Sequence, residues 1–174
     1  MKKLLTILLA IGLLLTLAAC GGSTPAETTG GAQSTVPTYA PDDNFTFTYK
    51  NVEITLNADA APIVAALGEP MKYTESTSCA FVGLDKTYYY GSFYLETYPD
   101  GDKDYVSAWW FADDTITTAE GVYIGADQAA VDKAYGAEAY NGSNAYTVKK
   151  AAGTLTVILE NGVVSSIQYA MNLG

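Results

Sequence analysis

Few side chains in this sequence can carry catalytic chemistry. The 174 residues include no histidine, and all nine basic residues are lysines. Imidazole is the commonest general base and metal ligand, and guanidinium is the usual clamp for phosphate and carboxylate, so both groups are missing. The sequence also contains no glycine-rich phosphate loop, no Cys-x-x-Cys pair and no Gly-x-Ser-x-Gly motif. We therefore expect a protein that is not an enzyme and has no cofactor.

One group of carboxylates has the spacing of a metal site. Asp100, Asp102 and Asp104 alternate as they would in a calcium loop. The sixth position of such a loop should be glycine and is Tyr105, and the twelfth should be glutamate and is Phe111. A solvated hairpin turn explains the same residues better, so no metal site is expected.

Two other groups are weak catalytic candidates. Asp113 and Asp114 could act as an acid–base pair, but adjacent residues of a strand diverge, and a turn after Ala112 explains them equally well. Cys79 could be a nucleophile, but no histidine can take its proton and its neighbours carry no positive charge. The simpler interpretation of Cys79 is a small buried strand residue.

A run of tyrosines gives the main binding signal. If residues 87–98 form one strand, the even-numbered side chains share one face and the odd-numbered, more aliphatic ones share the other. We expect the odd set to lie beneath a helix and the even set to point outward. Aligning residues 104–111 with 162–169 also places Trp110 outward. The predicted ligand-binding residues are Tyr88, Tyr90, Tyr94, Tyr98 and Trp110.

Tyrosine and tryptophan suit both protein contacts and stacking on sugar rings, because they combine a large apolar body with a polar tip. Two structural interpretations of the tyrosines stay open. The tyrosines could be cross-strand pairs on a solvated sheet, or the segment 45–50 could cover them.

An internal repeat predicts the elements that position these residues. Ala58–Gly68 and Ala126–Gly136 are identical at five of eleven positions. Each copy has an aspartate to cap a two-turn helix and a glycine to end it. Strands are expected at about 74–81, 87–98 and 104–112, and at about 144–150, 154–160 and 163–171. The predicted fold is α+β, with tandem repeats at about 52–118 and 119–174, each a short helix packed on an antiparallel sheet, and the two sheets are either separate or joined.

The repeat also carries a family resemblance. Three features resemble the tandem-repeat fold of the beta-lactamase inhibitory protein. They are the order of elements, the helix signature in Ile124–Gly136 and the Leu-Gly-Glu-Pro end of the first helix at Leu67–Pro70. Small outer-membrane assembly lipoproteins share this pattern. The resemblance covers about residues 52–169 and implies a protein that grips another protein with an aromatic sheet face. The inhibitor's disulfides are missing here, so beta-lactamase is not expected as the partner.

The N-terminus predicts export and anchoring. Lys2 and Lys3 precede an apolar run too short to span a membrane, which indicates a signal peptide at residues 1–19. Residues 17–20, Leu-Ala-Ala-Cys, resemble the lipobox of bacterial lipoproteins, which implies cleavage before Cys20 and lipid attachment to Cys20. Residues 20–44 would then be the lipidated cysteine and a disordered linker, and residues 45–174 the folded domain. We expect a lipid-anchored protein on the extracytoplasmic face of the cell membrane.

Charge narrows the partners further. The net charge of −10 falls to −12 once the signal peptide is removed, so nucleic acid is not expected as a partner. The leading hypothesis is a binding module for a protein or a cell-wall glycan. The alternative is a structural or envelope-assembly lipoprotein with no exposed ligand site.

Overall fold

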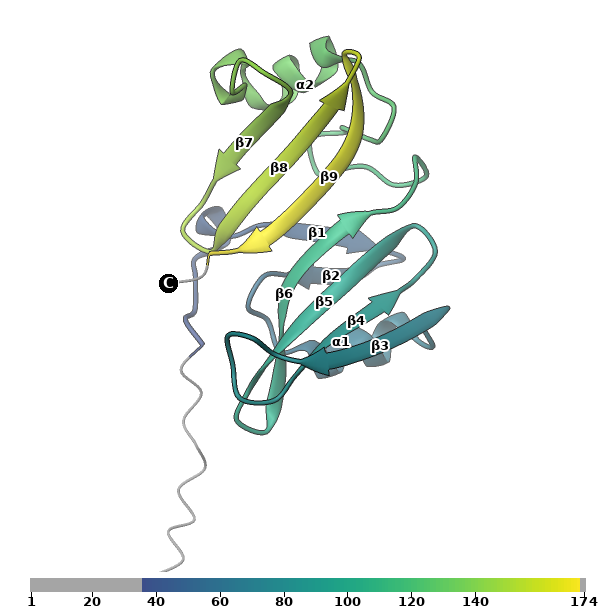
Figure 1. Cartoon of the computed structure of the whole chain (residues 1–174), viewed down its shortest axis with the longest axis vertical. Coiled ribbons are helices and arrows are strands. Elements are labelled where there is room, and N and C mark those ends of the chain that lie inside the picture. Colours follow the sequence, from purple (N-terminus) through teal and green to yellow (C-terminus); the bar gives the residue numbers. More distant parts are fainter. Residues whose placement is uncertain (1–35, 173–174) are drawn as a thin grey trace, which may run out of the picture. The chain divides into compact units, whose positions relative to one another are not determined.

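The computed structural model describes residues 36–172, which fold into an α+β unit with two α-helices and a large antiparallel sheet (Figure 1). The predicted α+β class is confirmed at this level. The signal peptide, Cys20 and the first part of the linker lie outside the described residues.

The large sheet has seven strands in the order β3-β4-β5-β6-β9-β8-β7, and every neighbouring pair is antiparallel. The β5–β6 and β8–β9 hairpins are long, whereas β6 and β9 pair only briefly in the middle. The strands are β3 (Lys72–Thr77), β4 (Leu84–Tyr89), β5 (Phe93–Asp100), β6 (Lys103–Phe111), β7 (Ala145–Lys149), β8 (Gly153–Glu160) and β9 (Val163–Met171).

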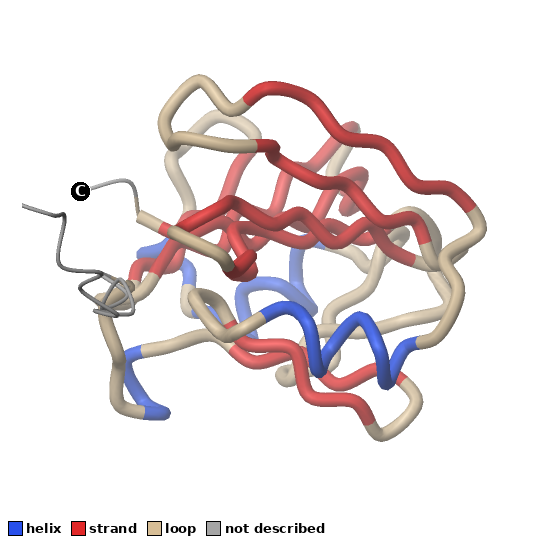
Figure 2. Tube along the Cα trace, turned by 90° about the horizontal axis from the view of Figure 1, so that it is seen from below, coloured by secondary structure: helices blue, strands red, loops and turns tan. Residues whose placement is uncertain are grey.

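One face of this sheet, the inner face, carries the core. A two-stranded hairpin, β1 (Thr46–Tyr49) and β2 (Val52–Thr55), packs on it together with α1 (Ala60–Leu67) and α2 (Gln128–Tyr135). Figure 2 shows helices and the small hairpin on one side of the main body of strands. Phe47 of β1 makes ring contacts with Phe93, Trp109 and Phe111 at 5.2 to 6.3 Å. The opposite, outer face is therefore free of these elements.

Both predicted helices are confirmed, including the residues that begin and end them. Asp59 accepts a hydrogen bond from the backbone N–H of Ala61 at 3.1 Å, and Asp127 accepts one from that of Ala130 at 2.8 Å. Gly68 and Gly136 end the helices at φ 80° and 82°, where a side chain would be strained. Each helix has only eight residues, so packing of Ile63 and Val131 into the core must hold it in place.

The prediction of one strand over residues 87–98 is wrong. The chain turns at Gly91-Ser92, with Gly91 at φ 91°, and the N–H of Tyr90 bonds to the carbonyl of Phe93 at 3.0 Å. A glycine followed by serine is a known two-residue hairpin turn. The first half of the sheet therefore has four strands, whereas the second half has the three that were predicted.

The packed part of the chain begins before Phe45. Residues 41–43 form a 3-10 helix (Pro41–Asp43), and a second one follows α2 at Ala137–Ala139. Asn44 is buried and donates from its amide to the carbonyl of Leu56 at 2.9 Å. The described end of the expected linker is thus tied to the fold rather than disordered.

Candidate functional site

The outer face carries one rank of side chains that are in register across all seven strands. Each member is the direct cross-strand partner of the next. From β3 to β7 the rank reads Lys72, Tyr89, Tyr94, Trp110, Gln168, Thr156 and Thr147. We call Tyr89, Tyr94 and Trp110 the aromatic row. The aromatic row and Lys72 make up the part of the rank on β3 to β6. An amide and two hydroxyl groups make up the part on β9 to β7.

The aromatic row is a stack of rings. The Tyr89 and Tyr94 ring centroids are 4.4 Å apart with 25° between the planes, and those of Tyr94 and Trp110 are 4.8 Å apart with 11°. All three side chains are half-buried. Because strands stand about 4.8 Å apart, the rings fill the spacing between strands and lean on one another. Their faces are turned toward each other, and their edges and polar tips are left for contact with a partner.

The segment 45–50 does not cover this row. Phe45 and Phe47 are buried in the core, and Tyr49 contacts Phe93 on the inner face at 5.0 Å. The expectation that this segment could cover the tyrosine face is therefore wrong for the aromatic row.

The structure brings together only part of the predicted ligand-binding set. Tyr94 and Trp110 point outward, as the strand pattern and the repeat alignment predicted, and their rings stack. Tyr88 and Tyr90 do not join them, because the turn at Gly91-Ser92 pairs odd residues of β4 with even residues of β5. Tyr88 is opposite Leu95 and packs against the core, where burial raises the pKa of its hydroxyl.

Tyr90 is a core residue. It is 9% exposed and stacks on Phe93 with ring centroids 5.3 Å apart. Its hydroxyl has no hydrogen-bond partner among the described residues, and burial raises its pKa to about 12. Tyr90 cannot contact a ligand in the described fold. The prediction that it binds a ligand is therefore wrong.

Tyr98 lies on the outer face but is only 5% exposed. The Phe81 ring, from the β3–β4 loop, lies over it with centroids 4.5 Å apart. Its hydroxyl donates to the side-chain carbonyl of Asn57 at 3.0 Å, and burial raises its pKa to about 12. The predicted face was right for Tyr98, but the predicted exposure was wrong.

Tyr89 is the outward residue that the sequence reasoning missed. The signal was present, because Gly91-Ser92 between two apolar-polar alternations is a hairpin turn. Reading that turn would have moved Tyr89 outward and Tyr88 and Tyr90 inward.

A cavity of about 290 Å³ lies on the outer face beside the aromatic row, beneath the β3–β4 loop. We call it the Glu96 cavity. Its walls include Phe81 and Tyr98, the carboxylates Asp85 and Glu96, and several hydroxyl groups. Glu96 also lines a shallow second hollow of about 260 Å³ with Trp110 and Gln168, so it links the cavity to the rank. Burial, and then repulsion from Asp85, raise the pKa of Glu96.

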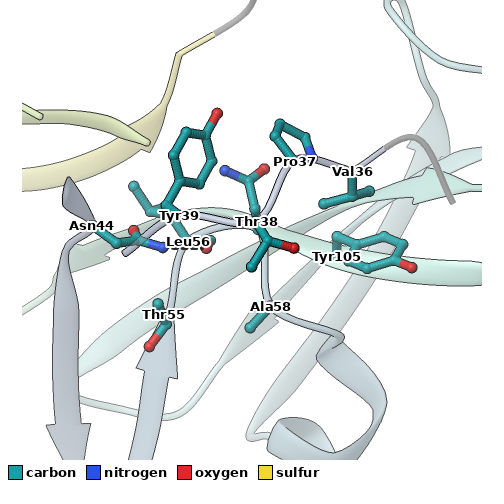
Figure 3. A pocket seen from close by; sticks show the side chains of 10 residues that line it. Val36, Pro37, Thr38, Tyr39, Asn44, Thr55, Leu56, Ala58 and Tyr105 are labelled. Atoms are coloured by element: carbon teal, nitrogen blue, oxygen red, sulfur yellow. Dashed lines mark hydrogen bonds between the residues drawn. The ribbon is translucent and has the colours of Figure 1, made fainter. Parts of the chain in front are cut away.

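A larger cavity, about 500 Å³, lies elsewhere (Figure 3). It forms where residues 36–39 cross residues 55–58, and Tyr39 and Tyr105 lie at opposite ends of it. None of the described residues that line it is charged. Its described lining includes no residue of the aromatic row and no charged group to select a partner, so it is a weaker candidate for a binding site than the outer face.

The carboxylates that resembled a metal site or an acid–base pair lie in or beside turns, and Asp104 of β6 forms an ion pair with Lys86 at 2.6 Å. Asp100 to Lys103 close the β5–β6 hairpin as predicted. Asp113 accepts hydrogen bonds from the backbone N–H and hydroxyl of Thr115, which lower its pKa. Within residues 36–172, no group of three or more histidine, cysteine or carboxylate side chains is placed to hold a metal ion.

Cys79 lies exposed in the β3–β4 loop, so the prediction of a buried strand residue is wrong. No helix in the described range is long and apolar enough to cross a membrane.

Comparison with known proteins found no match among protein-family models, curated proteins or solved structures.

Proposed function

We propose that this protein is a membrane-anchored, extracytoplasmic lipoprotein that binds another protein through the outer face of its sheet. The aromatic row carries this proposal, since it places three large side chains in a line on a face that the helices and the β1–β2 hairpin leave open. Aromatic side chains supply large contact area at small cost in conformational entropy, and they dominate protein interfaces.

The ring geometry favours a protein partner over a cell-wall glycan. A sugar stacks on the free face of an aromatic ring, but Tyr94 has a neighbouring ring on each side. Only the outermost faces of Tyr89 and Trp110 are left. Ring edges, two phenol hydroxyls and an indole N–H are the groups that meet a partner, and these suit the mixed apolar and polar surface of a protein.

Anchoring is the second part of the proposal. Cleavage before Cys20 and acylation of its thiol would hold the domain at the membrane, with the following residues as a tether. The acidic charge of the chain disfavours contact with an anionic lipid surface and so leaves the outer face available to a partner.

We also propose that the domain is a tandem repeat of the kind suggested by the resemblance to the beta-lactamase inhibitory protein. Matching backbone hydrogen bonds support this. Asn57 N–H bonds to the carbonyl of Val106 and Val106 N–H to that of Ala58, at 2.8 and 3.0 Å. The same pair recurs, with both distances 2.8 Å, between Gly125 or Ala126 and Val164.

The two halves of the sheet also have register shifts at corresponding positions. The β5–β6 register shifts between Glu96 and Thr97, and the β8–β9 register shifts between Ile158 and Leu159. Bulges are specific features of a strand pair, so two in corresponding positions favour a duplicated unit. Trp110 and Gln168 hold the same position in the two copies and are direct partners where the copies meet.

The alternative function, a structural or envelope-assembly lipoprotein with no exposed ligand site, is favoured by two observations. Tyr90 and Tyr98 are buried by their own chain. If such burial extended to the aromatic row in the assembled protein, the rings would only stabilise the sheet.

Site-specific photo-crosslinking in cells tests the binding proposal. The full chain carries a photoreactive residue in place of Gln168, next to Trp110 on the outer face, or in place of Glu53, an exposed residue of β2. We expect a discrete crosslinked species from position 168 and none from position 53. The species should disappear when Tyr94→Ala and Trp110→Ala are combined.

Tyr123→Ala is the matched control, because it removes an exposed tyrosine that lies outside the rank. It should leave the crosslink unchanged. Equal crosslinking from positions 168 and 53, or a crosslink that survives the double substitution in a folded protein, would reject the outer face as the binding surface.

A further inference from the structure

The Glu96 cavity has walls of two chemical kinds. Phe81 and Tyr98 supply aromatic surface, and Glu96 and Asp85 supply negative charge. The rest of the lining comprises the hydroxyl residues Ser76, Ser78, Thr87, Thr97 and Ser107, together with Ala80 and Met171. At about 290 Å³ the cavity lies at the small end of the range for ligand pockets and has room for a single side chain.

Neither carboxylate is paired with a lysine in the part of the chain that the structure describes. The ion pairs there join Lys86 to Asp104 and Lys103 to Asp59. Glu96 lies between Thr87 and Ala108 on the outer face and is half-buried. A carboxylate held in partial burial next to a second one is destabilised in its charged form, and a cation supplied from outside would relieve this.

The cavity is built before any ligand arrives. The hydroxyl oxygen of Ser78 accepts hydrogen bonds from the N–H groups of Ala80 and Phe81 at 3.4 and 3.2 Å, and Ser78 N–H bonds to the carbonyl of Gly83 at 3.0 Å. These bonds hold the loop so that Phe81 lies over Tyr98. A ligand therefore need not order the loop on binding, which favours affinity.

We infer that the Glu96 cavity receives a lysine or arginine side chain of the partner protein. The methylene stem lies along the Phe81 and Tyr98 rings, and the cationic head meets Glu96 and Asp85. That the partner is a protein rests on the proposed function. The cavity adds the chemical identity of one contact, because it selects a partner with a basic residue placed beside the aromatic row.

Titration with a small basic probe tests the cavity directly. The probe is N-acetyl-lysine methylamide, added to the detergent-solubilised full chain and followed by amide NMR shifts. We expect saturable shifts around Phe81, Glu96 and Tyr98 with a Kd on the order of 1 mM, as suits a ligand of this size. The uncharged norleucine analogue should produce none. The arginine analogue should act like the lysine probe.

Matched variants make the outcome decisive. Glu96→Gln keeps the shape and removes the charge, and it should weaken binding by about tenfold or more. Glu53→Gln removes an exposed carboxylate of β2 and should leave binding unchanged. Absence of shifts at the cavity, equal binding by Glu96→Gln, or shifts spread over the whole acidic surface would each overturn the inference.

The two proposals fail separately. If the photo-crosslink from position 168 persists while the lysine probe does not bind, the outer face binds a partner without using the cavity. If the probe binds and no crosslink forms, the cavity accepts basic groups while the aromatic row is not an interface.

Discussion

At the scale of single residues, Glu96 stands out because its position works against stability. Its partial burial and the nearby Asp85 raise its pKa, which means that the folded state favours the protonated carboxyl. A charged group kept where it destabilises the fold is typical of a functional site.

This position predicts a specific pH dependence for Glu96→Gln. A raised pKa contributes stability below its ordinary value of 4.5, and the contribution is lost as pH rises through the folded-state pKa. The variant should therefore be more stable than the natural chain at neutral pH, and the gain should vanish below 4.5. Urea unfolding at pH values on either side of 4.5 measures this. Glu53→Gln should show no such gain, and an equal gain at all pH values would contradict the assignment.

The aromatic residues show how far residue-level prediction reached. Alternation along the strand placed Tyr94 correctly, and the alignment of residues 104–111 with 162–169 placed Trp110 correctly, because both lie in regular parts of β5 and β6. Alternation failed for Tyr88, Tyr89 and Tyr90, because one tight turn inverts the faces on its other side. The burial of Tyr98 could not be predicted from strand pattern at all, since it depends on a loop that folds back over the sheet.

At the scale of elements, the β3–β4 loop depends on the absence of a side chain at Gly83. A β-carbon there would lie 2.8 Å from the Cβ and Cγ atoms of Pro99, and Gly83 has φ 137°. Pro99 is a rigid ring in β5, so it cannot move aside cheaply. The loop reaches its place over Tyr98 because Gly83 can lie directly against Pro99.

Gly83→Ala should therefore displace the loop and open the Glu96 cavity. We expect a loss of about 1–3 kcal/mol in the free energy of unfolding, from overpacking and backbone strain together. Gly121→Ala is the control, since Gly121 also has a positive φ of 86° but a β-carbon there would meet no described atom within 4 Å. Chemical denaturation compares the two variants, and near-ultraviolet circular dichroism reports on the Phe81 and Tyr98 rings. Equal losses would show that Pro99 does not matter.

The elements themselves were predicted where their ends carry chemical signals. Aspartate caps and terminal glycines located both helices, and Asn161-Gly162 located the β8–β9 turn, with φ 55° and 79°. The β1–β2 hairpin was missed because Lys50 and Asn51 adopt positive φ of 49° and 66° with no glycine to mark the turn. Whether the two halves shared one sheet stayed open, because the β6–β9 pairing depends on tertiary packing and has no local signal.

At the scale of the whole molecule, the proposed lipid anchor would decide where the outer face can act. Cys20→Ser removes the thiol that we propose is acylated, and it should release the protein from the membrane into the aqueous phase of a detergent phase separation. Cys79→Ser is the matched control, because Cys79 is an exposed loop residue and its loss should leave the protein membrane-bound. Retention of Cys20→Ser in the detergent phase would contradict the lipid anchor.

The unequal halves of the rank across the sheet have a geometric consequence. From β3 to β6 the rank consists of a lysine and three rings, and from β9 to β7 it consists of an amide and two hydroxyls. A face built alike on both sides would let a bound chain lie either way round. The two ends of this face differ chemically, so a partner that is complementary to both ends can bind in only one orientation.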